Sequence, residues 1–342
     1  MQAQVLTDLE QFEAEERERP TPAADEVLIN VRNVGICGSD VHYWQNGRIG
    51  DFVVEGDLVL GHESAGEVVD VGDAVSGLEA GDRVATEPGI PCRRCQHCKR
   101  GFYNLCRSDE FMATPPRDGA FVEYVSWPAD FVYPLPDSVT LTEGALCEPI
   151  SVCINACRRG DVGVGDTVLV TGCGPIGQIS MEVAYAFGAT DVIVSDVVPE
   201  KLDRTLERGA SRAVNVAEED LEAAVADFTD GQGADVVIEA SGAESAMQST
   251  IDAVRVGGTV VFVGMPEDGD IPLDTMSIIA KEADVHGSFR FKNTYPEAIS
   301  LLEKGAITVA DLVDFEMSLA DLQEAFERTR SDETVIKGLI TI

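Results

Sequence analysis

The pattern of hydrophobic and polar positions divides the chain into two parts. From Val5 to about Pro149, short alternating runs such as EVLINVRNVGI and SAGEVVDVGDAV are broken by glycine and proline. Alternation with a period of two is typical of half-buried strands, so we expect mainly β structure with long loops here. From about Gly163 onwards, continuous apolar runs that predict buried strands are separated by stretches that predict helices.

The second part contains six apolar runs that predict strands: TVLVTG, DVIVSD, RAVNV, DVVIEASG, GGTVVFVG and DVHGSF. Strands that alternate with helices form a doubly wound parallel sheet, the Rossmann arrangement. After Phe291 we expect two helices, near Tyr295–Lys304 and Leu319–Thr329, and then a strand in the final run VIKGLITI. A single strand needs a sheet, so this tail is predicted to return to the first domain.

The predicted fold class is therefore α/β, with a mainly-β domain and a six-stranded Rossmann domain. We expect the first domain at residues 1–150, the Rossmann domain at 151–289, and the return to the first domain at 290–342. A length of 342 residues agrees with two domains of about 150 residues each.

The sequence GCGPIG stands between the first predicted Rossmann strand and a helix. Glycines at 172, 174 and 177 permit a tight turn, the approach of a pyrophosphate, and close packing of helix on strand. Asp196 ends the next strand, where a carboxylate binds both adenosine ribose hydroxyls and repels a 2′-phosphate. The motif predicts a site that prefers NAD to NADP, although Lys201 could soften that preference. The alternative is a structural turn that binds nothing.

Four cysteines, Cys92, Cys95, Cys98 and Cys106, lie close together in PCRRCQHCKRGFYNLC. Four thiolates in one tight loop suit a tetrahedral Zn²⁺ ion with no open position, which is a structural site. The alternative is free or disulfide-paired cysteines. We expect His97, inside the loop, to be exposed rather than a ligand, because the thiolates already fill the metal's coordination shell.

A second group of possible metal ligands is dispersed along the chain: Cys37 in GICGSD, His62 and Glu63 in GHES, and Glu148 in CEPI. A thiolate, an imidazole and a carboxylate that leave one position for water or substrate are typical of a catalytic zinc site. Spacing alone does not establish the site. The remaining cysteines (Cys147, Cys153, Cys157 and Cys173) are expected to be buried apolar side chains, and His286 is expected to be structural.

The charge of the chain excludes some partners. Sixty-one acidic and 25 basic residues give a net charge of −36, which would repel nucleic acid and anionic membranes. Such self-repulsion is harmless near 1 M salt, where the screening length is about 3 Å, so we hypothesise a salt-adapted, halophilic enzyme. The alternative is an unusually acidic mesophilic protein. No apolar run reaches the ~18 residues of a membrane span and no secretory signal is visible, so a cytoplasmic protein is expected.

Several motifs together resemble the zinc-dependent medium-chain alcohol dehydrogenases: GHExxG at 61–66, GICGSDVH at 35–42, GDRV at 81–84, the four cysteines and GCGPIG. HYWQNGRIGDF, CEPISVCINACRR and GSFRFKNTYP resemble the polyol branch of that family, the sorbitol and xylitol dehydrogenases. The resemblance implies a GroES-like catalytic domain, a Rossmann domain, and an active site in the cleft between them. The complete set of four cysteines implies two zinc ions per chain and favours the xylitol dehydrogenases.

The resemblance also implies roles for individual residues. The catalytic zinc ligands would be Cys37, His62, Glu63 and, directly or through water, Glu148. Asp40 would hydrogen-bond the zinc histidine, and Ser39 and His42 would relay a proton. The residues implied to contact polyol hydroxyls are Tyr43, Glu148 and Arg290. The residues implied to line the cofactor site are Gly172, Gly174, Ile176, Gly177, Asp196, Lys201, Val263, Gly264, Met265, Ser288, Phe289 and Arg290.

The implied function is reversible oxidation of a secondary alcohol of a polyol by NAD, in a homotetramer. Two alternatives keep the zinc but change the substrate to L-threonine or 2,3-butanediol. A third, of another class, is a non-catalytic structural protein of the lens-crystallin kind.

Overall fold

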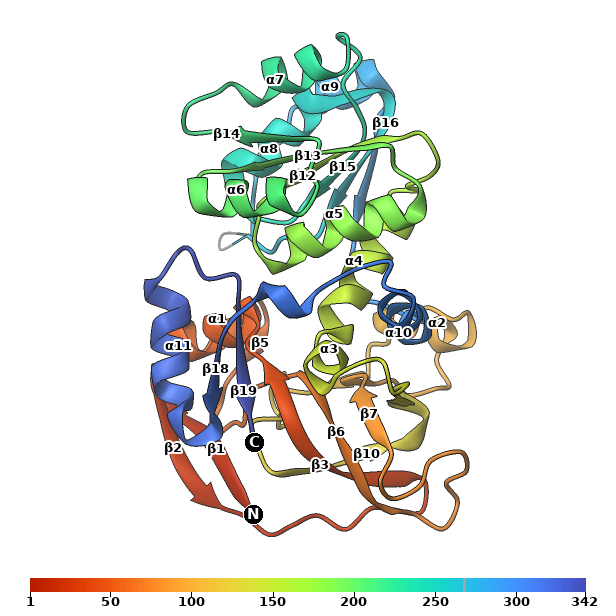
Figure 1. Cartoon of the computed structure of the whole chain (residues 1–342), viewed down its shortest axis with the longest axis vertical. Coiled ribbons are helices and arrows are strands. Elements are labelled where there is room, and N and C mark those ends of the chain that lie inside the picture. Colours follow the sequence, from red (N-terminus) through yellow and green to blue (C-terminus); the bar gives the residue numbers. More distant parts are fainter. Residues whose placement is uncertain (267–268) are drawn as a thin grey trace. The chain divides into compact units, whose positions relative to one another are not determined.

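The computed structural model describes residues 1–266 and 269–342 (Figure 1). These residues form two compact units: residues 1–148 with 295–342, and residues 149–294. The second boundary lies five residues beyond the predicted position at 289. Tyr295 explains the difference, because its hydroxyl donates to the Thr86 carbonyl oxygen at 2.9 Å and its ring stacks on Tyr133 with centroids 5.1 Å apart. The chain therefore re-enters the first unit at Tyr295.

The central sheet of the first unit has the strand order β11-β7-β6-β3-β19-β18, and β10 also pairs with β3. In chain order these strands are β3 (Glu26–Gly35), β6 (Glu63–Val71), β7 (Arg83–Thr86), β10 (Tyr124–Pro128), β11 (Val132–Pro134), β18 (Val313–Ser318) and β19 (Lys337–Thr341). Three two-stranded pairs complete the strands of this unit: β1 (Gln2–Asp8) with β2 (Gln11–Glu16), β4 (Arg48–Ile49) with β5 (Phe52–Val53), and β8 (Gly89–Ile90) with β9 (Glu110–Phe111).

The last strand, β19, belongs to the sheet of the first unit. Strand β19 lies antiparallel to β3, with Leu339 opposite Gly35, and parallel to β18. The sequence did not predict β18, because only one of its six residues is buried at this edge of the sheet and its apolar signal is weak.

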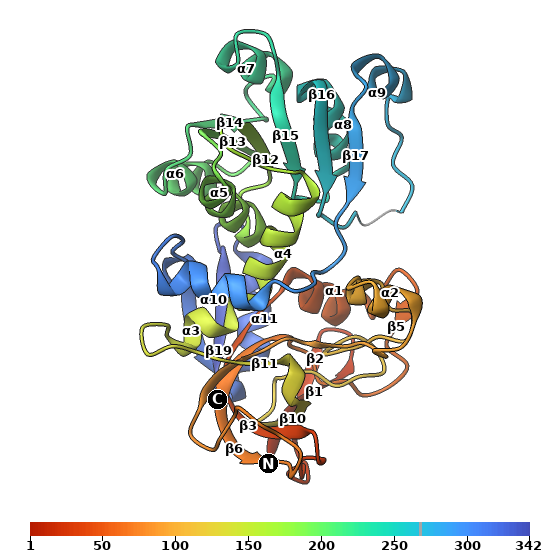
Figure 2. The same ribbon diagram turned by 90° about the vertical axis from the view of Figure 1, so that its right-hand side faces the viewer.

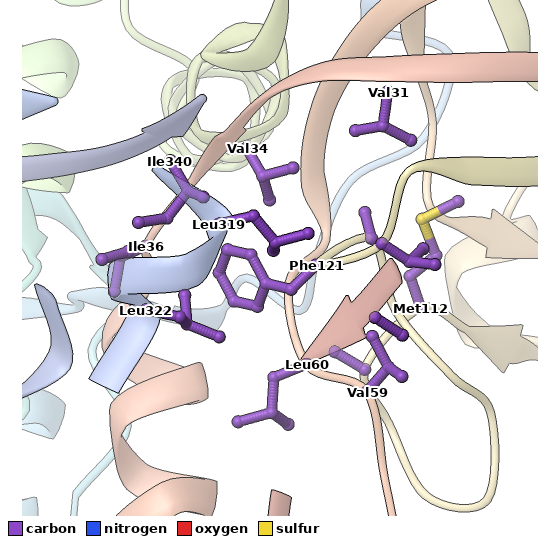
Figure 3. Close-up of a cluster of buried hydrophobic side chains, with 14 of the residues drawn as sticks. Val31, Val34, Ile36, Val59, Leu60, Met112, Phe121, Leu319, Leu322 and Ile340 are labelled. Atoms are coloured by element: carbon purple, nitrogen blue, oxygen red, sulfur yellow. The ribbon is translucent and has the colours of Figure 1, made fainter. Parts of the chain in front are cut away.

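The helices of the first unit connect and cover these strands. They are α1 (Gly38–Asn46), α2 (Gln96–Lys99), α3 (Leu141–Ala145), α10 (Tyr295–Glu303) and α11 (Leu322–Ser331), with 3₁₀ turns at Tyr103–Leu105, Ala129–Phe131, Ala310–Leu312 and Leu319–Asp321. Figure 3 shows part of the core, where Phe121 lies among Val34, Leu319 and Leu322. Side chains from the N-terminal and the C-terminal segments of this unit therefore pack in one core.

The second unit is the predicted six-stranded parallel sheet, with the order β14-β13-β12-β15-β16-β17. Its strands are β12 (Thr167–Thr171), β13 (Asp191–Asp196), β14 (Arg212–Asn215), β15 (Ala234–Glu239), β16 (Val254–Phe262) and β17 (Asp284–Gly287). Its helices are α5 (Pro175–Phe187), α6 (Pro199–Glu207), α7 (Leu221–Phe228), α8 (Glu244–Ala253) and α9 (Thr275–Lys281), and α4 (Cys147–Arg159) leads into it. Figure 2 shows β15, β16 and β17 side by side.

The strand order of this sheet reverses between β12 and β15. Open parallel sheets bind ligands outside the carboxyl ends of their strands at such a reversal. The fold therefore places a candidate ligand site where β12 ends. Among the described residues, no helix is long and apolar enough to cross a membrane.

Candidate functional site

Three of the dispersed candidate ligands meet in the first unit. One ligand atom each from Cys37, His62 and Glu63 lies within 4.8 Å of the others. Strand pairing explains the proximity, because Gly35 at the end of β3 is the register partner of Glu63 at the start of β6. A thiolate, an imidazole and a carboxylate this close together fit a zinc ion with an open position.

Asp40 holds the imidazole of this group. Its carboxylate lies 3.3 Å from His62 Nδ1 and accepts the backbone N–H groups of Gly61 at 3.0 Å and Cys37 at 3.2 Å. With Nδ1 bonded to Asp40, Nε2 is the nitrogen left to face a metal. Burial lowers the pKa of His62, but Asp40 and the Cys37 thiolate together raise it well above its usual value. A bound metal would displace that proton.

Lys337 pairs with Glu63, and the sequence analysis did not find it. Its ammonium lies 2.6 Å from the Glu63 carboxylate and donates to the Ile36 carbonyl oxygen at 2.9 Å, and both side chains of the ion pair are at most 3 % exposed. A Cβ at Gly35 would lie 2.0 Å from Glu63 Oε2, so only glycine leaves room for this carboxylate. The available signal was a lysine inside the apolar terminal run VIKGLITI.

Glu148 is buried but lies outside the three-residue group. Burial and the neighbouring Glu63 and Asp40 raise its pKa to about 7, against the opposing effects of His62 and Lys337. Its carboxyl group is therefore close enough to interact electrostatically with the candidate ligands. Its binding to zinc, directly or through water, stays a prediction.

Three other residues implied near this centre, Ser39, His42 and Tyr43, lie on helix α1. The Ser39 hydroxyl donates to Cys37 Sγ at 3.3 Å, which places it beside the candidate metal ligand. His42 is partly exposed, and Tyr43 is 4 % exposed within the hydrophobic core. Their roles in proton relay and polyol binding stay predictions.

The four clustered cysteines also meet. Their sulfur atoms lie within 4.8 Å of one another, with 3.4 Å between Cys95 and Cys98 and 3.9 Å between Cys92 and Cys98. A tetrahedral ion with Zn–S bonds of 2.3 Å requires sulfur atoms about 3.8 Å apart, so the cluster fits zinc. Backbone N–H groups of Arg94 and Cys95 lower the pKa of Cys92 to about 6, which favours the thiolate. His97 lies outside the cluster and is partly buried rather than exposed.

A buried carboxylate ties the cysteine lobe, residues 92–106, to the sheet. Glu87 accepts the hydroxyl of Tyr103, inside the lobe, at 2.6 Å and that of Tyr133, on β11, at 2.9 Å. Its carbonyl oxygen accepts Trp127 Nε1–H at 2.8 Å. Burial raises the pKa of Glu87 to about 7. Sequence analysis missed this residue because its partners are distant along the chain.

The glycine motif forms the turn that was predicted. Gly172 has φ 91°, and a Cβ at Gly177 would lie 1.7 Å from the Gly172 carbonyl oxygen. By contrast, a Cβ at Gly174 would meet nothing within 4 Å, so the start of helix α5 is open to a phosphate. Asp196 accepts the Cys173 backbone N–H at 2.6 Å, which places the acidic strand end against the glycine turn. These features fit a dinucleotide.

The remaining candidate cofactor residues surround the carboxyl ends of the neighbouring strands. Val263 and Gly264 follow β16, where their N–H groups donate to the Glu239 carbonyl oxygen at 2.8 and 3.0 Å. Ser288 follows β17. Met265 and Phe289 are 58 % and 48 % exposed, and four more are partly exposed: Ile176, Lys201, Ser288 and Arg290. They therefore line the edge at which a parallel sheet binds ligands.

Two family models match most of the chain. One describes an alcohol dehydrogenase GroES-like domain and matches residues 23–137, and the other describes a zinc-binding dehydrogenase and matches residues 175–304. The chain is a zinc-dependent medium-chain dehydrogenase. It is an oxidoreductase that uses zinc and a nicotinamide cofactor, and the resemblance inferred from its motifs is confirmed.

Relatives of the dehydrogenase match along nearly its full length. Sorbitol dehydrogenase of Bacillus subtilis is 44 % identical over 96 % of this chain and 93 % of the relative. D-xylulose reductase A of Aspergillus niger is 43 % identical over 94 % and 93 %, and sorbitol dehydrogenase of Mus musculus is 46 % identical over 91 % and 87 %.

Solved structures share the fold of the dehydrogenase. An Escherichia coli oxidoreductase of unknown specificity has a TM-score of 0.96 and 36 % identity, covering 100 % of this chain and 99 % of that one. A 2R,3R-butanediol dehydrogenase from Bacillus subtilis has a TM-score of 0.91 and 32 % identity over the same shares.

Proposed function

We propose that the dehydrogenase transfers hydride from a secondary alcohol of a polyol of the sorbitol or xylitol kind to NAD. The observation that carries the proposal is the convergence of Cys37, His62 and Glu63 in a chain whose relatives are sorbitol dehydrogenases and a xylulose reductase. A dehydrogenase that oxidises a polyol and a reductase that reduces the corresponding ketose catalyse one reaction in opposite directions. The names sorbitol dehydrogenase and xylulose reductase therefore indicate the same chemistry.

The chain's own residues prepare this chemistry. When bound, zinc supplies Lewis acidity toward the substrate oxygen and the nicotinamide supplies the hydride acceptor. Asp40 holds His62 in one orientation, and Lys337 compensates the negative charge of Glu63. The Ser39 hydroxyl, beside Cys37, can receive the proton that the alcohol loses and pass it to His42.

We also propose NAD specificity and two zinc ions per chain. The carboxylate of Asp196, at the end of β13, favours two free ribose hydroxyls over a 2′-phosphate. The second zinc would occupy the four-cysteine cluster, whose sulfur spacing fits tetrahedral coordination.

A homotetramer in the cytoplasm, adapted to high salt, completes the proposal. The exposed apolar side chains of Met276 and Ile279 on α9, and of Val285 on the edge strand β17, support self-association. The net charge of −36 supports a salt-rich environment.

A substrate panel tests the proposal. The purified protein in molar KCl would be assayed for NADH absorbance with sorbitol, xylitol, ribitol, L-threonine and 2,3-butanediol. We expect the highest kcat/KM with a polyol. Activity confined to butanediol would favour the second candidate, which the structural similarity to a butanediol dehydrogenase supports. No turnover of any alcohol by zinc-loaded protein would favour the non-catalytic alternative.

A further inference from the structure

Helix α4 holds the stretch of chain that follows β17 through one buried amide. Asn155, 2 % exposed, donates from Nδ2 to Ser288 Oγ at 2.9 Å and to the Arg290 carbonyl oxygen at 3.1 Å. Lys292 Nζ donates to Asn155 Oδ1 at 3.3 Å. A carbonyl oxygen on one side and an ammonium on the other fix the orientation of the amide. The Asn155 side chain therefore forms three hydrogen bonds, two as donor and one as acceptor, to three residues of the stretch.

Two exposed arginines on the next turn of α4 contact the same stretch. Arg158 donates to the Asn293 carbonyl oxygen and Arg159 to the Gly287 carbonyl oxygen, both at 3.2 Å. Arg159 also lies 3.2 Å from His286 Nδ1, which agrees with a structural role for that histidine. These outer bonds lie in solvent, where water can replace them, whereas the Asn155 bonds are partly buried and start from a buried side chain.

The backbone of residues 288–293 needs such support. Arg290 has φ 50° and Asn293 has φ 51°, in the left-handed region that non-glycine residues rarely adopt. No helix or strand contains these residues. Conformations of this kind are strained and persist only where surrounding contacts determine them. The Asn155 amide is such a contact, because it bonds the backbone of Arg290 and the side chains of Ser288 before it and Lys292 after it.

We propose that Asn155 is a positioning residue for the reaction, which sets where Ser288 and Arg290 present themselves to the nicotinamide and the polyol. This inference rests on the proposed function, in which those two residues contact cofactor and substrate. Neither an aspartate, which lacks the N–H donors, nor a leucine of similar volume can reproduce the three bonds.

The experiment compares Asn155→Ala and Asn155→Leu with the wild type. We expect kcat/KM for the preferred polyol to fall at least about tenfold, because small misplacements of binding groups have large effects on rate. Thr250→Ala is the matched control, since Thr250 is equally buried in the same unit and its hydroxyl donates to the carbonyl oxygen of Met247 on its own helix. The control should leave KM and kcat unchanged.

Two further measurements separate positioning from a general loss of stability. In an Arg290→Ala background, adding Asn155→Ala should change KM for the polyol less than about threefold, because the group it positions is already absent. Hydrogen exchange of residues 286–294 should be faster in Asn155→Ala than in wild type and unchanged in the control. The exchange measurement needs no turnover.

The outcomes distinguish the inference from the proposed function. If wild type oxidises a polyol and Asn155→Ala retains its kcat and KM, the positioning role is overturned while the function stands. If wild type oxidises no polyol, the function fails. The positioning role then fails with it, and the exchange measurement reports only whether Asn155 holds the stretch.

Discussion

Lys337 is a single buried charge whose removal should be costly. Lys337→Met would leave the Glu63 carboxylate buried without its cation, so the free energy of unfolding of the zinc-free protein should fall by about 3–5 kcal/mol. Denaturant unfolding in molar salt measures the loss. The double variant Lys337→Met/Glu63→Gln is the matched control, because it removes both charges and should recover much of the stability. Equal stability of Lys337→Met and wild type would contradict the prediction.

Cys37 is the one cysteine in the three-residue group with His62 and Glu63, and it is not part of the four-cysteine cluster. Cys37→Ser should abolish turnover and remove one zinc ion per chain, because the catalytic site loses its thiolate while the four-cysteine cluster stays intact. Elemental analysis of the purified variant measures the metal. Retention of the full zinc content with normal kcat would show that the ion does not bind here.

Asp196 is proposed to act on the cofactor rather than on the metal. Asp196→Ala should raise the dissociation constant for NADH by about tenfold or more and reduce the preference for NADH over NADPH, because the 2′-phosphate is no longer repelled. Fluorescence titration with both cofactors measures the change, and zinc content serves as the control. An unchanged ratio of the two affinities would contradict the assigned role.

Glu87 ties the cysteine lobe to the sheet, and its ionisation should make the stability of the protein depend on pH. Because burial raises its pKa to about 7, the folded state binds this proton more tightly than the unfolded state does. The stabilisation is present below the ordinary glutamate pKa and is lost as the pH rises through about 7. Between pH 5 and 8 the wild type should therefore lose up to about 3 kcal/mol more unfolding free energy than Glu87→Gln. Unfolding curves at both pH values test this, and parallel losses would contradict it.

At the same scale, the sequence predicted elements whose signals are local. Apolar stretches mark four of the six Rossmann strands clearly and mark β14 and β17 weakly, and all six occur in one parallel sheet. Helix α1 and strand β18 were not predicted, because α1 has little apolar periodicity and only one of the six residues of β18 is buried. The boundary at Tyr295 depends on its contact with Thr86, which is distant along the chain.

In the candidate site, too, some residues are recognisable from local sequence and others are not. The glycine motif and the four cysteines are recognisable from spacing over a few residues, and the dispersed ligands became recognisable only through family motifs. Glu87 and Asn155 have no local signal, and the signal of Lys337 is only a lysine within an apolar run, because each acts on partners that only the tertiary fold brings near.

At the scale of the whole molecule, the excess of acidic residues should make stability depend on salt. The screening length is about 3 Å at 1 M salt and about 30 Å at 0.01 M, so repulsion among 61 acidic side chains grows as salt is removed. We expect Tm to be higher in molar KCl than in dilute buffer at the same pH. A Tm that does not change between the two solutions would remove the basis for salt adaptation.

The position of β19 within the first unit's sheet bears on how the chain folds during synthesis. Residues 149–294 are contiguous, so everything that the parallel sheet needs has been synthesised before residue 300 is added. The other sheet waits for Lys337–Thr341, which lie between β3 and β18 and supply the cation beside Glu63. Nascent chains should therefore acquire protease resistance in residues 149–294 first, and β3 should lack its partner β19 until synthesis is nearly complete.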